Sequence, residues 1–244
     1  AVIKDFANQV NAMFVSKGWD KQWIQHLADE PTDTNAEDYR KLSDIMRKYV
    51  PEITIVEATM TRTLSGAVDI WCPQVQKYQA NKEFFDEMQD NGDKVWTYTC
   101  LNPGGPWLNR LLDQEHLRQV YLGWAAFQYG TEGFLHWGLN HYKADPFEQS
   151  VVDHPAMPNT TNKLPAGDTH VVYPGTKGPW SSIRFEAHRI GIEDYVMLKM
   201  LSKKSASPPE IPGKTELFKA YDDWNADVVF YREVRQNLLN SLAE

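Results

Sequence analysis

The 244-residue chain lacks long apolar runs and clusters of basic residues. A membrane-spanning helix needs roughly 20 consecutive apolar residues, and no stretch approaches that length, so no membrane span is predicted. With a formal net charge of −8 and no basic run, the chain has little with which to neutralise phosphates, which argues against nucleic acid as a partner. The first residues contain no basic segment followed by an apolar one, and hence no signal-peptide pattern.

Cysteines and metal-binding motifs are also scarce. Cys72 and Cys100 are too few for a disulfide framework or a four-sulfur zinc site, and both a single pairing and two free thiols fit. No HExxH or CxxC motif is present. A metal site made of His26, Asp29 and Glu30 is disfavoured, because residues three apart on a strand face opposite sides. The sequence therefore implies no metal and no organic cofactor.

Aromatic residues are abundant, with nine Trp and eleven Tyr. Sugar rings expose apolar C–H faces, and flat indole rings suit these faces sterically and electronically. A core rich in tryptophan would give the same composition. The aromatic content is therefore compatible with sugar binding but does not decide between the two interpretations.

Short apolar segments alternate with helical patterns along the first half of the chain. Buried strands are predicted over 23–28, 53–58, 67–71, 94–100 and 133–138. Helices are predicted over 36–49, 74–91 and 115–129. Such alternation predicts a parallel sheet with helices outside it.

Each predicted strand ends in residues that can do chemistry, which favours an α/β fold of the (β/α)₈ TIM-barrel type. These residues are Asp29 and Glu30, Glu57, Asp69 and Trp71, Tyr98 and Cys100, and Trp137 and Asn140. Active sites of such barrels lie at the carboxyl ends of the strands. A flavodoxin-like open sheet is the competing architecture, but it usually offers a glycine-rich phosphate loop, and none is visible. Because a barrel needs eight strands, this chain is predicted to hold only strands four to eight, with the first three upstream.

The second half of the chain contains fewer strand signals. A long loop over 141–178 is typical of a functional segment, and 169–173 fits a short strand within it. A helix is predicted over 181–204. The predicted division is residues 1–204 as the C-terminal part of the barrel, 205–214 as a proline-rich linker, and 215–244 as a C-terminal helix packing on the barrel.

Four strings of residues, in order, resemble the catalytic domain of glycoside hydrolase family 123, the β-N-acetylgalactosaminidases. They are HLADEP at 26–31, VDIWCPQ at 68–74, GFLHWGLN at 133–140, and SIRFEA at 182–187 followed by GIEDY at 191–195. Gly167-Asp168 and Tyr173-Pro174-Gly175 fit between the last two, and the similarity runs from about Trp23 to Met200. The chain departs from the family pattern by lacking the front of the barrel and the β-sandwich that usually precedes it.

The resemblance implies a retaining, exo-acting enzyme that acts on β-linked N-acetylgalactosamine in glycans. It also implies an upstream half of the same barrel and an extracellular or periplasmic location. By resemblance, Asp29 orients the 2-acetamido group that acts as nucleophile, and Glu30 is the general acid and base. Pro31 is expected to hold Glu30 in an extended conformation, so that both side chains reach one pocket.

Further residues are expected to contact the sugar, although each is as compatible with barrel packing. They are Trp71, Tyr98, Trp107, Trp137, Asn140, Asp168 and Tyr173. Asp29 and Glu30 are also typical of a helix start, where Asp29 would be the cap. Two other functions stay open: a carbohydrate-binding or inactive relative without a complete barrel, and a glycosidase of the same fold acting on sugars without an acetamide group.

Overall fold

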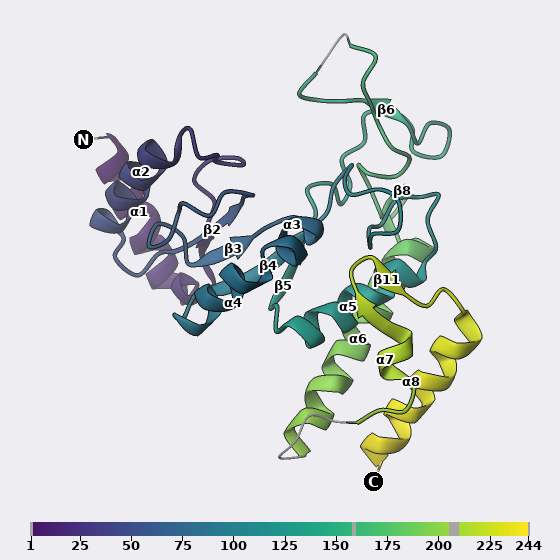
Figure 1. The fold of residues 1–244 in the computed structure, drawn as a ribbon. Helices are drawn as coiled ribbons and strands as arrows, with labels where there is room; N and C mark the ends of the chain where they lie inside the picture. Colours follow the sequence, from purple (N-terminus) through teal and green to yellow (C-terminus); the bar gives the residue numbers. More distant parts are fainter. Residues whose placement is uncertain (1, 158–159, 205–209, 244) are drawn as a thin grey trace. The chain divides into compact units, whose positions relative to one another are not determined.

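The chain forms two units in a computed structural model, which describes residues 2–157, 160–204 and 210–243 (Figure 1). The first unit is Ala1–Tyr98 and the second is Thr99–Glu244. The predicted division at residue 204 stays a prediction, and residues 205–209 of the predicted linker lie outside the described residues. In the described part of the chain, no helix combines the length and hydropathy needed to cross a membrane.

Four parallel strands form the sheet of the first unit, which confirms the α/β class. They are β1 (Ile24–Gln25), β2 (Thr54–Ala58), β3 (Ile70–Cys72) and β4 (Lys94–Tyr98). Neighbours in the sheet are neighbours in the chain: β1 pairs with β2, β2 with β3, and β3 with β4. Residues of β2 and β3 are almost all buried, as expected of a parallel sheet covered on both faces. Because all three pairings are parallel, the carboxyl ends of the four strands lie at the same edge of the sheet.

The helices of the first unit differ from prediction at two places. They are α1 (Val2–Lys17), the short 3₁₀ helix η1 (Asp20–Gln22), α2 (Ala36–Tyr49), α3 (Val75–Ala80) and α4 (Lys82–Asp90). Helix α1 was not predicted, and α2 has the predicted bounds. The single helix predicted over 74–91 is interrupted at Asn81, whose φ of −128° is not helical. Gly92 follows α4 with a φ of 101°, a conformation that glycine adopts readily.

Two crossing helices organise the second unit. Helix α5 (Leu117–Tyr129) precedes β5 (Gly133–Leu135), and α6 is the long helix Ile183–Lys204. The helices touch where Gly123 meets Gly191: a Cβ on Gly123 would lie 1.9 Å from the carbonyl oxygen of Gly191. Glycine at both positions therefore lets the two backbones approach to contact.

Small antiparallel pairs occupy the loop between β5 and α6. They are β6 (Val152–Asp153) with β7 (Lys163–Leu164), and β8 (Tyr173–Gly175) with β9 (Gly178–Trp180). The strand predicted over 169–173 is instead a single bridge between His170 and Asn140, with β8 beginning at Tyr173.

The C-terminal segment is not the single helix predicted for residues 215–244. It consists of α7 (Lys214–Leu217), β10 (Phe218–Ala220), β11 (Asp223–Trp224) and α8 (Val228–Ala243). Asp227 starts α8 by accepting a hydrogen bond from the Val229 N–H at 2.8 Å. Helix α8 then packs on α5 and α6 through buried Asp194, which accepts hydrogen bonds from Trp124, Tyr231 and Arg235.

Candidate functional site

Asp29 and Glu30 lie in a bend that follows β1, at the carboxyl end of the first strand. The Asp29 side chain is 91% exposed, and Glu30 is exposed as well. Helix α2 begins at Ala36 with Asn35 in the cap position, so the interpretation of Asp29 as a helix cap is wrong. Both carboxylates are therefore open to a ligand.

The backbone at Glu30 differs from the predicted extended conformation. Its φ is 44°, the single positive φ at a non-glycine residue in the described part of the chain. Residues with a side chain rarely adopt this region, and where they do the surrounding structure holds them there. The bend, rather than an extended residue before Pro31, turns the Glu30 side chain outward.

Tyr98 holds the Glu30 side chain. Its hydroxyl donates a hydrogen bond to Oε1 of Glu30 and lies 3.1 Å from Sδ of Met60. Tyr98 ends β4 and is only 3% exposed, so packing fixes its ring. The structure thus brings Tyr98 to the predicted acid, as the convergence of strand ends implied.

Glu57 supports the segment that leads into the two carboxylates. This residue of β2 is completely buried, and its Oε2 accepts hydrogen bonds from the Tyr39 hydroxyl at 2.6 Å and the Ala28 N–H at 3.4 Å. Its Oε1 lies 2.7 Å from Nδ1 of His26. Burial raises the pKa of Glu57, opposed by the hydrogen bond from Tyr39 and by the charge of His26. From the sequence, Glu57 could be recognised only as a strand-end carboxylate.

Threonines that follow β2 hold the other side of the bend. The Thr59 hydroxyl donates to the Pro31 carbonyl oxygen at 2.7 Å. Thr61 and Thr63 both hydrogen-bond to Asp33, and these bonds lower the pKa of the Asp33 carboxyl. The bend is therefore fixed to the end of β2 both before and after Asp29-Glu30.

Trp71 does not line this site. It is completely buried in β3, its indole N–H donates to Oδ2 of Asp93 at 2.8 Å, and its ring packs edge-on against Phe84 at 5.3 Å between centroids. A ring with no exposed face has nothing to stack on a sugar. The prediction that Trp71 contacts substrate is corrected: it is a core residue of the first unit.

In the second unit, Trp137 and Asp168 form a pair. The Trp137 side chain is 40% exposed, and its indole N–H donates to Oδ2 of Asp168 at 3.0 Å. Asp168 is completely buried, with its Oδ1 3.2 Å from Nε2 of His136. A buried carboxylate does not reach a ligand directly, so the expected sugar contact of Asp168 is corrected to a supporting contact with Trp137.

The remaining predicted residues are exposed or partly exposed in the second unit. Asn140 is exposed beside its bridge to His170, and Trp107 is half-buried. Tyr173 is half-buried and packs against Phe147 with ring centroids 5.1 Å apart. These positions are compatible with ligand contact, and Asn140, Trp107 and Tyr173 stay predictions.

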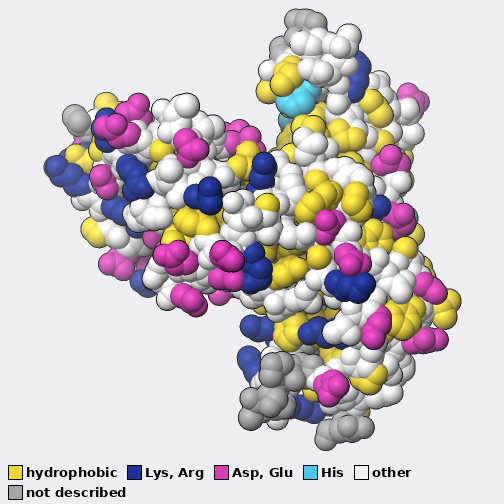
Figure 2. Space-filling view, viewed as in Figure 1, with side chains coloured by type: hydrophobic (Ala, Val, Ile, Leu, Met, Phe, Trp, Pro, Cys, Tyr) yellow, Lys and Arg dark blue, Asp and Glu magenta, His cyan; other side chains and the backbone are white. Residues whose placement is uncertain are grey.

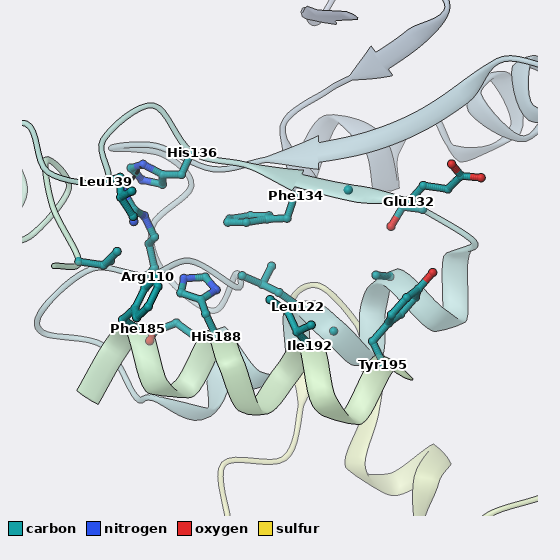
Figure 3. Close-up of a pocket in the computed structure, with 16 residues that line it drawn as sticks. Arg110, Leu122, Glu132, Phe134, His136, Leu139, Phe185, His188, Ile192 and Tyr195 are labelled. Atoms are coloured by element: carbon teal, nitrogen blue, oxygen red, sulfur yellow. Dashed lines mark hydrogen bonds between the residues drawn. The ribbon is translucent and has the colours of Figure 1, made fainter. Parts of the chain in front are cut away.

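A pocket of about 450 Å³ lies between α5, β5 and α6 within the second unit (Figure 3). Across this pocket, Phe134 of β5 faces His188 and Ile192 of α6. Arg110 reaches its edge, and burial together with nearby Arg184 lowers the Arg110 pKa to about 9. Burial also lowers the pKa of His188 to about 3. The sequence does not reveal this pocket, because its lining comes from three separate elements.

Acidic and basic side chains are mixed on one face of the molecule. On the face drawn in Figure 2, Lys and Arg side chains are interspersed with Asp and Glu. Within residues 2–157, 160–204 and 210–243, no three His, Cys, Asp or Glu side chains gather as a metal site would require. Cys72 is a buried free thiol.

Comparison with known proteins gives a family match and structural matches. Residues 1–201 match the model of the glycoside hydrolase 123 catalytic domain. A family 123 glycoside hydrolase from Clostridium perfringens, studied for glycolipid glycan hydrolysis, is similar in structure, with a TM-score of 0.64 and 17% sequence identity. That match covers 98% of this chain and 42% of the other, so this chain spans less than half of its length. The search of curated proteins found no significant match.

Proposed function

Because this chain belongs to the glycoside hydrolase 123 catalytic-domain family, we propose that it carries the catalytic residues of a retaining, exo-acting β-N-acetylgalactosaminidase. The observation that carries the proposal is the pair of adjacent, exposed carboxylates in the bend after β1. Asp29 and Glu30 occupy the string HLADEP that resembles the family. Membership of the family supports a glycosidase, and the sugar, the mechanism and the roles of Asp29 and Glu30 are the proposed parts.

The reaction proceeds through the substrate's own acetamide. The acetamide carbonyl oxygen attacks the anomeric carbon while the glycosidic C–O bond breaks, and Glu30 gives its proton to the leaving oxygen. An oxazoline-like ring results. Asp29 accepts a hydrogen bond from the acetamide N–H, which orients the group and stabilises the positive charge that develops on it. The common glycosidase arrangement of two opposed carboxylates is not needed when the substrate supplies the nucleophile.

The second step restores the enzyme. Glu30, now a carboxylate, takes a proton from a water molecule, and the water oxygen attacks the anomeric carbon and opens the ring. Two successive displacements at one carbon give net retention of configuration. Tyr98 supports both steps, because a hydroxyl fixed by burial keeps the Glu30 carboxyl in place as it loses and regains a proton.

We also propose that further strands from an upstream half complete the barrel. A (β/α)₈ barrel has eight strands, of which this chain would supply the fourth to the eighth. The partial coverage of the Clostridium perfringens enzyme supports this, since 42% of that chain accounts for nearly all of this one. Trp137, held by Asp168, is the proposed stacking platform for the sugar.

A pair of aryl glycosides tests the proposed function. We expect turnover of an aryl β-N-acetylgalactosaminide and none of the matched aryl β-galactoside, because the galactoside has no acetamide to act as nucleophile. Turnover of the galactoside would instead indicate a glycosidase that does not use an acetamide. Binding without turnover of either compound would indicate a carbohydrate-binding relative. The aryl β-N-acetylglucosaminide is the control for the sugar itself.

A further inference from the structure

We propose that Trp180 and Phe147, with Glu148 beside them, form a second sugar-binding site, which takes a neutral sugar unit of a glycan. The site lies in the second unit, on the long loop between β5 and α6 where β8 and β9 form a hairpin (Figure 1). Neither carboxylate of the proposed reaction belongs to it. The inference therefore goes beyond the proposed function and needs only that the chain belongs to a family of glycoside hydrolases.

A hollow of about 480 Å³ lies at this hairpin, and we call it the aromatic hollow. Its volume falls within the range of roughly 300–1,000 Å³ that is usual for ligand pockets. The side chains that line it are mostly apolar or aromatic, with a few polar groups among them, which is the usual composition of such pockets. The lining residues are Leu112, Pro146, Phe147, Glu148, Ser150, Tyr173, Trp180, Ser181 and Ser182.

Two large aromatic side chains are exposed at the aromatic hollow. Trp180 is 53% exposed and Phe147 is 56% exposed, and their ring centroids lie 5.9 Å apart. A single exposed apolar residue needs no explanation, but here two large rings lie together and leave apolar surface in water. Because rings stabilise a fold mainly through burial, this exposure contributes little to stability. The pair is instead suited to a ligand with an apolar face.

Neighbouring residues hold the two rings in place before any ligand binds. Phe147 also packs against Tyr173, with ring centroids 5.1 Å apart, and Tyr173 packs edge-on against the buried His170 ring at 5.0 Å. The Trp180 indole lies against Gly175, where an added Cβ would come within 2.3 Å of the indole atoms Cδ1 and Nε1. Glycine at position 175 therefore makes room for the indole. A surface that is already ordered loses less entropy when it binds a ligand.

The polar groups of the aromatic hollow select the chemistry of the ligand. Of the described residues that line it, Glu148 alone has an acidic or basic side chain, and it is exposed. A carboxylate accepts hydrogen bonds from sugar hydroxyls and repels carboxylate, phosphate and sulfate groups. Ser150 adds a hydroxyl that can donate or accept. Flat rings beside such groups fit a neutral pyranose, which has an apolar C–H face and a rim of hydroxyls.

The family favours a sugar over the other ligands that exposed aromatic rings bind. Aromatic grooves also take proline-rich peptides, but a glycoside hydrolase acts on glycosides. A second sugar site on such an enzyme holds another part of the same glycan. Holding one part raises the effective concentration of the rest of the glycan around the enzyme, without any new contact at the catalytic carboxylates.

Binding of lactose to the full-length protein tests the inference. Lactose is a neutral β-linked disaccharide without an acetamide group, so it is not a substrate of the proposed reaction. We expect saturable binding in an NMR titration of the tryptophan indole signals. Trp180→Ala and Phe147→Ala should each weaken binding about tenfold, because truncating a central aromatic contact is costly. Trp19→Ala is the matched control, since Trp19 is 50% exposed in the first unit, and it should leave the affinity unchanged.

Glu148→Gln tests whether the ligand is neutral. Sialyllactose, which adds a carboxylate to lactose, should bind the wild type at least about threefold more weakly than lactose, and Glu148→Gln should reduce that difference. Tighter binding of sialyllactose than of lactose to the wild type would contradict a site for a neutral sugar. Thermal unfolding shows which variants are folded, and if Trp180→Ala is not, Phe147→Ala and Glu148→Gln still decide.

Failure of this inference and failure of the proposed function are distinguishable, because lactose binding requires no turnover. If the wild type cleaves neither aryl glycoside, the proposed function is wrong, and the lactose titration still tests the aromatic hollow. Lactose binding that is lost in Asp29→Asn and kept in Trp180→Ala would place the sugar at the catalytic carboxylates and overturn the inference. The absence of saturable lactose binding to the wild type would overturn it as well, even in an active enzyme.

Discussion

The hydroxyl of Tyr98, at the end of β4, donates a hydrogen bond to Oε1 of Glu30 in the bend after β1. The two residues are 68 positions apart in the chain, and the contact joins a buried ring to an exposed carboxyl. Such a contact can hold a proton donor in place without closing the site to substrate. It also gives a test of Glu30 that leaves Glu30 itself intact.

Tyr98→Phe should lower kcat/KM for an aryl β-N-acetylgalactosaminide by about 10- to 100-fold. A hydrogen bond to a charged group is worth about 1.5–3 kcal/mol, and 1.4 kcal/mol corresponds to a factor of ten in rate. Steady-state kinetics measure the effect. Tyr121→Phe is the control, because it removes a buried hydroxyl that bonds to the Asn225 carbonyl oxygen in the second unit. Equal losses in the two variants would exclude a specific role for Tyr98.

Glu30→Gln should affect poor leaving groups more than good ones. Removing a general acid matters most for alkyl and sugar leaving groups of high pKa, whereas an activated aryl group departs with little protonation. We expect kcat/KM to fall about 1,000-fold for alkyl and sugar leaving groups and about tenfold for an activated aryl group. A plot of kcat/KM against leaving-group pKa measures the difference. A uniform loss across the series would contradict the assignment of Glu30 as the acid.

Replacing Trp71 and replacing Trp137 by alanine should affect different properties, stability in the first case and substrate binding in the second. Trp71→Ala empties a fully buried position, so the free energy of unfolding should fall by about 3–5 kcal/mol. Trp137 is 40% exposed, so Trp137→Ala should cost less stability and instead raise KM if its ring stacks on the sugar. Urea unfolding measures the loss of stability in both variants, and steady-state kinetics measure the change in KM. A raised KM in Trp71→Ala at full stability would reverse our correction.

The strand and helix pattern was predictable where local signals agree. Helix α2 was predicted with its observed bounds, because its apolar spacing is helical and Pro51 follows it closely. The hairpin of β10 and β11, which replaces the first part of the predicted C-terminal helix, was not predictable from the sequence. It depends on distant contacts such as the packing of Phe218 against Tyr121, with ring centroids 6.0 Å apart. Helix α1 was not predicted either, and it packs through Phe14 against Trp23, at 4.8 Å between centroids.

The candidate site was predictable only in part, because some of its residues depend on contacts between distant parts of the chain. Asp29 and Glu30 could be identified because they are adjacent in a distinctive string. The burial of Trp71 could not be predicted, because all three residues of β3 are buried and the sequence shows no alternation that would tell a core-facing residue from a ligand-facing one. The role of Glu57 depends on Tyr39 and His26, which come from other elements and are joined to it only by folding.

The crossing of α5 and α6 makes a clear stability prediction. Gly123→Ala should destabilise the second unit by about 1–3 kcal/mol or more, because the added Cβ would lie 1.9 Å from the Gly191 carbonyl oxygen and must push the helices apart. The control is Gly104→Ala, where an added Cβ meets nothing within 4 Å and φ is not positive. Thermal unfolding compares the two. A stabilised Gly123→Ala would mean that the helices do not touch there.

Two histidines with lowered pKa values, His188 and His136, should make the protein lose stability in mild acid. Burial lowers the pKa of His188 to about 3 and that of His136 to about 4, from 6.5. Between pH 6.5 and about 4 the unfolded chain therefore binds protons that the folded chain refuses, so the free energy of unfolding falls as pH falls. Each such histidine contributes a slope of up to about 1.4 kcal/mol per pH unit.

His188→Phe isolates this effect from the titration of the carboxylates. The variant should show a shallower fall in the free energy of unfolding between pH 6.5 and 4 than the wild type, measured by urea unfolding at each pH, because one proton fewer is taken up on unfolding. Phe134→Leu, beside the His188 ring in the same pocket, should shift the whole curve without changing its slope, since Phe134 does not titrate. If His188→Phe kept the wild-type slope, His188 would already be protonated in the folded protein at pH 5, and an uncharged ring at this position would be ruled out.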